Sequence, residues 1–334
     1  MMKQLLIALS LSAFTLGLSA CSTKNTPTEL GGNVSQNYAA PKVYSDHRAQ
    51  QQFFDTGSGK IAFTDTGPQT ANAPVIVLLH GVPTSSWMYR KVVPNLQQNL
   101  RVITVDQLGY GSSEKPERDR ADYSPAAQAR RVEALLKSRG VNSYSVLMHD
   151  MGGLTAWEML DAHPDQIENL VVLNTIVRDK GFQEPNMDGG FFVGQLMKAF
   201  TAPLTSSRIM DKVFFDLGLK GEYKLSEEEC YGYVRPMREG ADGALYSFFT
   251  NINDDLFDEL AEKRKSWPAY KGRVMVMWGA QDETLTTRQI PRLQESFNIP
   301  ESDVHIYENN GHFLAEEIPD EVVIKVSEFI TRGG

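Results

Sequence analysis

The sequence predicts an α/β fold, in which a mostly parallel, doubly wound sheet carries helices on both faces and a helical cap is inserted over it. Short apolar runs recur along the chain, and most are continuous rather than alternating, which is typical of strands buried on both faces. Helical patterns separate several of these runs, and one long interval contains no such run. The runs comprise residues 75–79, 102–105, 144–148, 170–174, 274–278 and 304–307.

Two segments between and after these runs carry clear helix signals. In residues 124–140, Ser124 can cap the first turn, Pro125 suits the next position, and Gly140 can end the helix in a left-handed conformation. After Pro319 the chain repeats apolar residues at helical spacing, which predicts a helix that docks on the sheet. Its apolar face comprises Val322, Val323, Val326, Phe329 and Ile330.

The interval between residues 176 and 267 has no comparable strand run and contains helix-like pieces instead. We therefore predict that residues 51–175 and 268–334 form the α/β core and that residues 176–267 form the cap.

The first residues join a basic start at Lys3 to an apolar run and then to small residues, the pattern of an export signal. The run is too short and too interrupted for a membrane-spanning helix. We assign residues 1–20 to a signal peptide and the polar residues 21–50 to a tether.

The signal ends in "LSAC", which resembles the lipobox of bacterial lipoproteins. This resemblance implies that Cys21 is lipidated and that the protein is anchored at the periplasmic face of the cell envelope, at the outer membrane because Ser22 rather than an aspartate follows. The alternative is an ordinary cleaved signal with an incidental cysteine. If Cys21 carries lipid, Cys230 is the only thiol left, and no internal disulfide is expected.

Composition excludes several classes of protein. The apolar content of 41% over 334 residues suits a globular protein with a real core. The net charge of −9, without a basic block, argues against a nucleic-acid partner. The six histidines are scattered and no Cys and His cluster has metal-ligand spacing, so the sequence predicts neither a metal site nor a cofactor.

The stretch "VLMHDMGGLTAW", residues 146–157, has the arrangement of a nucleophile elbow. Asp150 lies at the tip, between a strand and a helix, and Gly152 and Gly153 allow the helix to start close by. The alternative is that Asp150 caps that helix.

Three further loops agree with a catalytic site. "HGVPTSSWMYR", residues 80–90, follows an early buried strand, where an amide of an oxyanion hole is expected, here from Val82. Asp282 and His312 follow two later strands, which gives the chain order nucleophile, acid, base. His80, His149 and Asp106 are expected to brace this region through hydrogen bonds and loop shape.

At this point the chain resembles the α/β-hydrolase fold, within the branch that has an aspartate nucleophile: haloalkane dehalogenases and epoxide hydrolases. The resemblance covers about residues 53–331 and is carried by "HGVPTSSWMYR", "DQLGYGSSEKP", "HDMGG", "GAQD", "GHF" and, in the cap, "YVRPM". It implies a small-molecule hydrolase in which Asp150 forms a covalent alkyl ester. His312, oriented by Asp282, would then activate water, while the amides of Val82 and Met151 hold the oxyanion.

The chain departs from both patterns in this branch. Dehalogenases bind the departing halide through side-chain N–H donors, but the residues at two of those positions, Met151 and Val82, have none. Epoxide hydrolases use two cap tyrosines as proton donors; Tyr233 matches the second, and residues 175–220 contain no match for the first. Candidate substitutes for it are Tyr223, Tyr231 and Tyr246.

Because of these departures, the sequence does not decide whether the leaving group is a halide or an epoxide oxygen. Two other hypotheses stay open: a hydrolase of another small ester or lactone, and a non-catalytic binding lipoprotein that reuses the fold.

Overall fold

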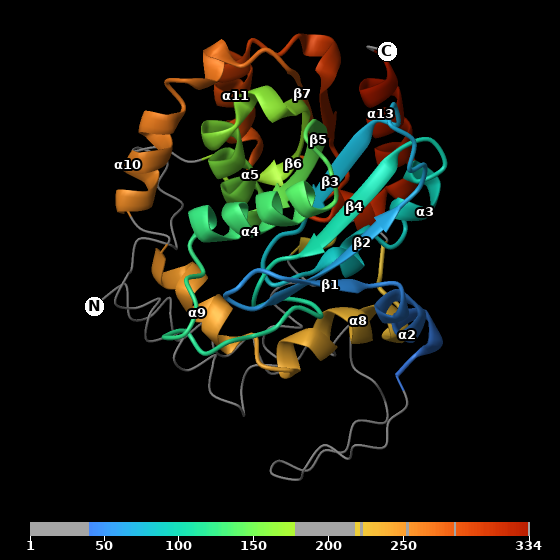
Figure 1. Ribbon diagram of the computed structural model, residues 1–334. Helices are drawn as coiled ribbons and strands as arrows, with labels where there is room; N and C mark the ends of the chain where they lie inside the picture. The colour runs from blue at the N-terminus through green and yellow to red at the C-terminus, as the bar shows by residue number, and fades with distance from the viewer. Residues whose placement is uncertain (1–39, 178–217, 221–222, 252–253, 284, 333–334) are drawn as a thin grey trace, which may run out of the picture.

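The computed structural model describes residues 40–177, 218–220, 223–251, 254–283 and 285–332, and these are built around one eight-stranded sheet (Figure 1). The strand order is β1-β2-β4-β3-β5-β6-β7-β8. The pairs that involve β2 are antiparallel and all others are parallel, so the predicted mostly parallel sheet is confirmed. The strands are β1 (Gln52–Asp55), β2 (Lys60–Thr66), β3 (Val75–Leu79), β4 (Arg101–Asp106), β5 (Tyr144–Asp150), β6 (Ile167–Thr175), β7 (Arg273–Gly279) and β8 (Val304–Tyr307).

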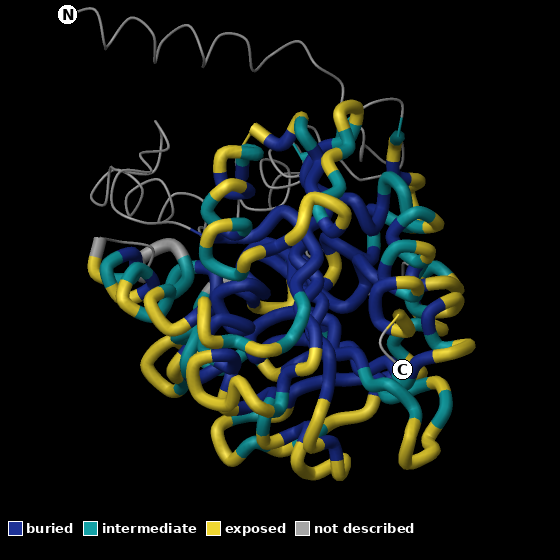
Figure 2. The backbone as a smooth tube through the Cα atoms, turned by 90° about the horizontal axis from the view of Figure 1, so that it is seen from above, coloured by how far each residue is buried: buried dark blue, intermediate teal, exposed yellow. Residues whose placement is uncertain are grey.

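Helices cover both faces of the sheet because its central strands are apolar on both sides. On β5, Val146 and Met148 belong to one core cluster, and Leu147 belongs to the other. The first cluster includes residues of α4 (Pro125–Ser138), α5 (Met151–Ala162) and α11 (Ile290–Phe297). The second includes residues of α3 (Val93–Leu96), α12 (Leu314–Glu317) and α13 (Pro319–Thr331). Figure 2 shows the buried centre between these layers.

Both helices with clear sequence signals are present. The Ser124 hydroxyl accepts a hydrogen bond from the Ala127 amide at 3.3 Å, and Pro125 opens α4. Gly140, just beyond the helix, has a φ of 69°, as a left-handed stop requires. On α13 the buried residues are Val322, Val326, Phe329 and Ile330, which is the predicted docking face except for Val323.

The described part of the predicted cap is helical, with α8 (Glu227–Arg238), α9 (Asp242–Asn251) and α10 (Asp254–Lys263). Ser226 and Glu229 form a reciprocal capping box at the start of α8. Residues 178–217 of that interval lie outside the described residues, and the domain boundaries stay a prediction.

The predicted signal peptide, with Cys21, lies outside the described residues, but the end of the predicted tether does not. Residues placed there form a helix, α2 (Lys42–Ala49), because Tyr44 gives this polar segment one buried anchor. The Tyr44 ring packs edge-on against Trp87 of the core, with centroids 5.5 Å apart, and against Tyr231 of α8.

Cys230 of α8 is disulfide-bonded to a partner outside the described residues, whereas the sequence predicts no internal disulfide only if Cys21 carries lipid. Among the described residues, no helix is long and apolar enough to cross a membrane.

Candidate active site

Asp150 lies at a strained turn between β5 and α5. Its φ of 50° and ψ of −120° are rare for a residue with a side chain. A Cβ on Gly152 would overlap the Leu79 carbonyl, and a Cβ on Gly153 would overlap the Thr175 hydroxyl, so the chain needs glycine at both positions to turn this sharply. The Asp150 side chain makes no capping hydrogen bond to α5, which argues against a purely structural cap.

The Asp150 carboxylate points toward the loop that follows β3. Its Oδ1 accepts a hydrogen bond from the Val82 amide at 2.8 Å. A Cβ on Gly81 would overlap the Asp150 side chain, so only glycine lets the loop approach so closely. The arrangement fits an oxyanion hole, because the oxygen held by the amide becomes the carbonyl oxygen if Asp150 is esterified.

The structure brings His312 and Asp282 to the same place. His312 Nδ1 donates to Asp282 Oδ2 at 2.6 Å, and His312 Nε2 lies 3.9 Å from Asp150 Oδ2. The exposed fractions are 8% for Asp150, 8% for His312 and 4% for Asp282, so all three are shielded from bulk water. With its proton on Nδ1, the imidazole presents an unprotonated Nε2 toward Asp150.

The charges in this site depend on one another. Burial raises the pKa of Asp150 above its ordinary value, and the His312 charge and the Val82 and Met151 amides offset only part of that rise. Burial alone would lower the pKa of His312, but the negative charges of Asp282 and Asp150 raise it overall. Burial would raise the pKa of Asp282, but its interaction with His312 lowers it overall, so Asp282 stays ionised.

Asn174, at the end of β6, orients the acid and was missed by the sequence analysis. Its Nδ2 donates to Asp282 Oδ2 at 2.8 Å, and its Oδ1 accepts from the Gly279 amide at 2.9 Å. It has a φ of 24° and is fully buried. The available signal was its position, since a polar side chain that ends a buried parallel strand lies at the edge where such sites form.

The expected bracing by neighbouring polar residues is confirmed. His149 Nε2 donates to the His312 carbonyl at 2.9 Å, and the two rings lie 4.4 Å apart. Burial holds the pKa of His149 well below its ordinary value, so it does not add a positive charge beside His312. His80 accepts from the Gln107 amide, and Asp106 accepts from the amides of Ser86 and Ser112.

Comparison with protein families identifies the architecture. A family model described as alpha/beta hydrolase fold matches residues 74–319, most of the chain. The chain belongs to this family. It is therefore an α/β-fold hydrolase with a site at the carboxyl edge of its sheet.

Curated relatives within the alpha/beta hydrolases have several activities. A cis-3-alkyl-4-alkyloxetan-2-one decarboxylase of Shewanella oneidensis is 24% identical over 85% of this chain and 89% of its own length. Epoxide hydrolase 3 of Xenopus tropicalis is 24% identical over 77% of this chain and 71% of its own length. Haloalkane dehalogenase 2 of Mycobacterium tuberculosis is 24% identical over 84% of this chain and 94% of its own length.

Among solved structures, a haloalkane dehalogenase of Bradyrhizobium elkani superimposes with a TM-score of 0.68. It is 20% identical and covers 84% of this chain and 97% of its own, which shows a shared fold.

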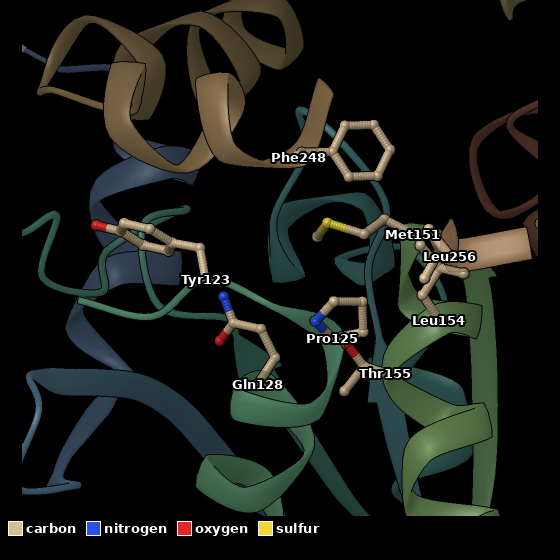
Figure 3. A pocket seen from close by; sticks show the side chains of 8 residues that line it. All are labelled: Tyr123, Pro125, Gln128, Met151, Leu154, Thr155, Phe248 and Leu256. Carbon is tan, nitrogen blue, oxygen red and sulfur yellow. The ribbon is translucent and has the colours of Figure 1, made fainter. Parts of the chain in front are cut away.

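A small pocket beside the elbow of this hydrolase is lined by mostly apolar side chains (Figure 3). The Met151 thioether lies between Phe248 and Pro125, and the hydroxyl of Tyr123 points away from the other labelled side chains. That hydroxyl donates to the Pro116 carbonyl. The lining residues are Tyr123, Pro125, Gln128, Met151, Leu154, Thr155, Phe248 and Leu256.

The remaining polar groups of the pocket are also engaged. The Gln128 amide bonds the Leu108 backbone through both its oxygen and its nitrogen. The Thr155 hydroxyl donates to Gln107 Oε1 at 2.6 Å. The pocket wall therefore offers a substrate mainly apolar contact.

Tyr233, the predicted cap proton donor, lies in a buried polar network between α8 and the core. Its hydroxyl donates to Glu316, which also pairs with Arg90. In this arrangement the Tyr233 proton is already engaged by a carboxylate, and its role as a donor to substrate stays a prediction. A pattern match could not reveal this, because Glu316 is 83 residues away along the chain.

Proposed function

We propose that this chain hydrolyses small organic molecules through a covalent ester at Asp150. The proposal rests on the contacts of that carboxylate. Asp150 Oδ1 accepts a hydrogen bond from the Val82 amide at 2.8 Å, and Asp150 Oδ2 lies 3.9 Å from His312 Nε2. A serine at an elbow suits attack on an acyl carbonyl. A carboxylate instead suits in-line displacement at a saturated carbon.

In the first step, an Asp150 oxygen forms a bond to the substrate carbon, and the leaving group departs with the bonding electrons. In the second step, His312 takes a proton from water, and the resulting hydroxide attacks the carbonyl carbon of the Asp150 ester. The amides of Val82 and Met151 stabilise the oxyanion. The alcohol then leaves and Asp150 is regenerated.

The leaving group is either a halide or a ring oxygen, and the residues favour oxygen. Met151 and Val82, at two positions that carry halide donors in dehalogenases, have side chains without N–H groups. We therefore put an epoxide hydrolase-like reaction ahead of a haloalkane dehalogenase-like one.

A second candidate reaction is opening of a lactone or another small ester. It is favoured by the relative from Shewanella oneidensis, whose named substrate is an oxetan-2-one, a four-membered cyclic ester. Product analysis separates the candidates. Epoxide opening releases a diol, and dehalogenation releases a halide and an alcohol. Opening of a lactone or ester releases a carboxylic acid or carbon dioxide.

His312→Gln is expected to stop the reaction at the ester. Glutamine keeps much of the side-chain volume but cannot accept a proton from water, so only the second step is blocked. Incubation with a panel of terminal epoxides, alkyl halides and lactones should add one substrate-derived mass to each chain, as measured by intact-protein mass spectrometry. Peptide mapping should locate the mass on Asp150.

His163→Gln is a matched control, because His163 is a half-exposed histidine that lies beyond the end of α5. This variant should turn over substrate without accumulating an adduct. Absence of any adduct in His312→Gln across the whole panel would contradict the ester mechanism.

We further propose that the mature protein is an exported lipoprotein, anchored through Cys21 at the periplasmic face of the envelope. This lipidated state excludes an internal disulfide at Cys230, because Cys21 is the only other cysteine of the chain. The support is the "LSAC" pattern after an apolar run. Cys21→Ser is expected to abolish incorporation of a radiolabelled fatty acid and to reduce the membrane-bound fraction strongly. Ser22→Ala serves as the control and should retain the label. A wild-type chain that takes up no label would refute the anchor.

A further inference from the structure

The loop that carries His312 is held by hydrogen bonds on both sides of this histidine. Glu317, at the end of α12, accepts them. Its Oε2 accepts from the Gly311 amide at 2.9 Å and from Asn310 Nδ2 at 3.2 Å, and its Oε1 accepts from the Phe313 amide at 3.3 Å. One carboxylate therefore joins the residues before and after His312, and hydrogen bonds to a charged acceptor are strong.

A short piece of the predicted cap, residues 218–220, contacts the same loop, and we call it the strap. The Gly218 carbonyl accepts a hydrogen bond from the His312 amide at 2.7 Å. The Lys220 backbone hydrogen-bonds the Glu317 carboxylate. Glu317 and the strap therefore hold each other as well as the loop of the base.

The strap fits this loop because two glycines lie at the contact. A Cβ on Gly218 would overlap the Phe313 ring, and a Cβ on Gly311 would overlap the Gly218 carbonyl. An alanine at either position would therefore push the strap away from the loop.

The strap also reaches the loop of the acid. Lys220 Nζ lies 2.7 Å from Glu283 Oε1, and Glu283 directly follows Asp282 in the chain. Glu283 is mostly exposed, so water screens this pair and its own contribution to stability is small. The pair nevertheless shows that the strap contacts both loops whose side chains form the hydrogen bond between His312 and Asp282.

The other polar groups of His312 are fixed by the core. Its carbonyl accepts from His149 Nε2 at 2.9 Å, and its Nδ1 donates to Asp282. Asp282 therefore orients the ring, whereas Glu317 and the strap fix the backbone that carries it. A base must lie within hydrogen-bond reach of the proton that it takes, so a small shift of this backbone would be costly.

We propose that Glu317 is a positioning residue for the base and that, through the strap, it makes the placement of His312 depend on the cap. The inference rests on the ester mechanism proposed above and concerns its second step. Hydrolysis needs His312 Nε2 aimed at a water beside the esterified Asp150, whereas ester formation uses the Asp150 carboxylate and needs no base. Loss of the Glu317 contacts should therefore slow hydrolysis much more than formation.

The charges around the base agree with this role. Burial alone would lower the pKa of His312, but three carboxylates raise it overall, in decreasing order of effect those of Asp282, Asp150 and Glu317. The neighbouring His149 stays neutral, because burial holds its pKa well below the ordinary value. On the strap, the Lys220 ammonium pairs with Glu283. Loss of the Glu317 charge should therefore lower the pKa of His312, by less than loss of the Asp282 charge.

The test measures ester formation and ester hydrolysis separately, by single-turnover mass spectrometry of the intact chain with terminal epoxides and alkyl bromides as probes. Glu317→Gln keeps the side-chain length, but an amide has one accepting oxygen, and its NH₂ group would face a backbone N–H donor. We expect hydrolysis to slow by about 10- to 100-fold and formation to stay within about 3-fold. The acid limb of the hydrolysis rate should move to lower pH.

Glu317→Asp separates position from charge. The shorter side chain keeps the negative charge but cannot reach the amides on both sides of His312 at once. Hydrolysis should slow again, whereas the acid limb should stay at the wild-type pH. Gly218→Ala, which pushes the strap away from the loop, should also slow hydrolysis and spare formation.

Glu133→Gln is the matched control. Glu133 of α4 is also half-buried, and burial also raises its pKa, but it lies 4.0 Å from His163 rather than beside the base. Its replacement should change neither step.

Three results would overturn the positioning role and leave the ester mechanism intact: wild-type hydrolysis in both Glu317 variants, equal slowing of the two steps, or an unmoved acid limb in Glu317→Gln. Wild-type hydrolysis in Gly218→Ala would overturn the dependence on the cap. No ester from any probe in His312→Gln, where it should accumulate, would overturn both the ester mechanism and this inference.

Discussion

Asp150→Asn is expected to lower kcat by about 10⁴-fold or more while leaving the protein folded. The amide is a poor nucleophile, so no alkyl ester forms. The shape of the site should persist, because asparagine tolerates positive φ and its carbonyl oxygen can still accept from the Val82 amide. A pure binding protein would show no such dependence, which distinguishes the enzyme from that alternative.

The same variant is expected to be more stable at pH 7, by about 1 kcal/mol. The folded-state pKa of Asp150 is raised, chiefly by burial, so ionisation favours the unfolded chain. This cost is absent below the unfolded-state pKa and appears as the pH rises through the folded-state value. The gain in the free energy of unfolding should therefore shrink toward acidic pH, as measured by denaturant titration at several pH values.

Asp303→Asn is the matched control for Asp150→Asn. Asp303 is also buried, but it pairs with Arg332 near the start of β8. Its replacement should leave kcat unchanged and should not stabilise the protein. Turnover of Asp150→Asn near the wild-type rate would refute a role for Asp150 as nucleophile.

The core of the fold could be predicted because parallel strands buried on both faces have a recognisable local sequence pattern. The runs over β3 and β5 are continuous and apolar, so composition alone identifies them. Strands β1 and β2 were missed because they are antiparallel and more polar. Thr64 of β2, for example, is buried because its hydroxyl pairs with that of Thr104 at 2.7 Å. That partner is 40 residues away and invisible to a local pattern.

The residues of the candidate site also fall into two groups, those marked by a local sequence pattern and those placed by contacts distant in sequence. Asp150, His312 and Asp282 could be located because each follows a recognisable strand, and the structure brings them together. Asn174 could not, because its importance comes from which strand ends the sheet order makes neighbours. Local sequence identifies the ends of strands, whereas contacts between those ends depend on the whole sheet.

Asp282→Asn is expected to lower kcat by about 10³- to 10⁴-fold, mainly by slowing hydrolysis of the ester. Asp282 accepts hydrogen bonds from His312 Nδ1, from Asn174 and from the Leu285 amide. An amide has one accepting oxygen and an NH₂ group that only donates. If the NH₂ group faces His312, the imidazole must carry its proton on Nε2 and cannot take one from water.

This change also alters the pH dependence. The Asp282 and Asp150 charges together raise the pKa of His312 above its ordinary value, and the base is active only when neutral. Ester formation removes the Asp150 charge, so in the intermediate Asp282 becomes the main source of that rise. Without the Asp282 charge, the acid limb of the ester-hydrolysis rate should shift to lower pH.

The two effects of Asp282→Asn can be separated by single-turnover kinetics. The ester should form at a rate close to that of the wild type, because Asp150 keeps its contact with Val82, and should then persist for minutes or longer. Asp320→Asn, in the first turn of α13, is the matched surface control. Equal slowing of ester formation and hydrolysis would contradict the model, because it would mean that Asp282 maintains the whole site rather than the orientation of His312.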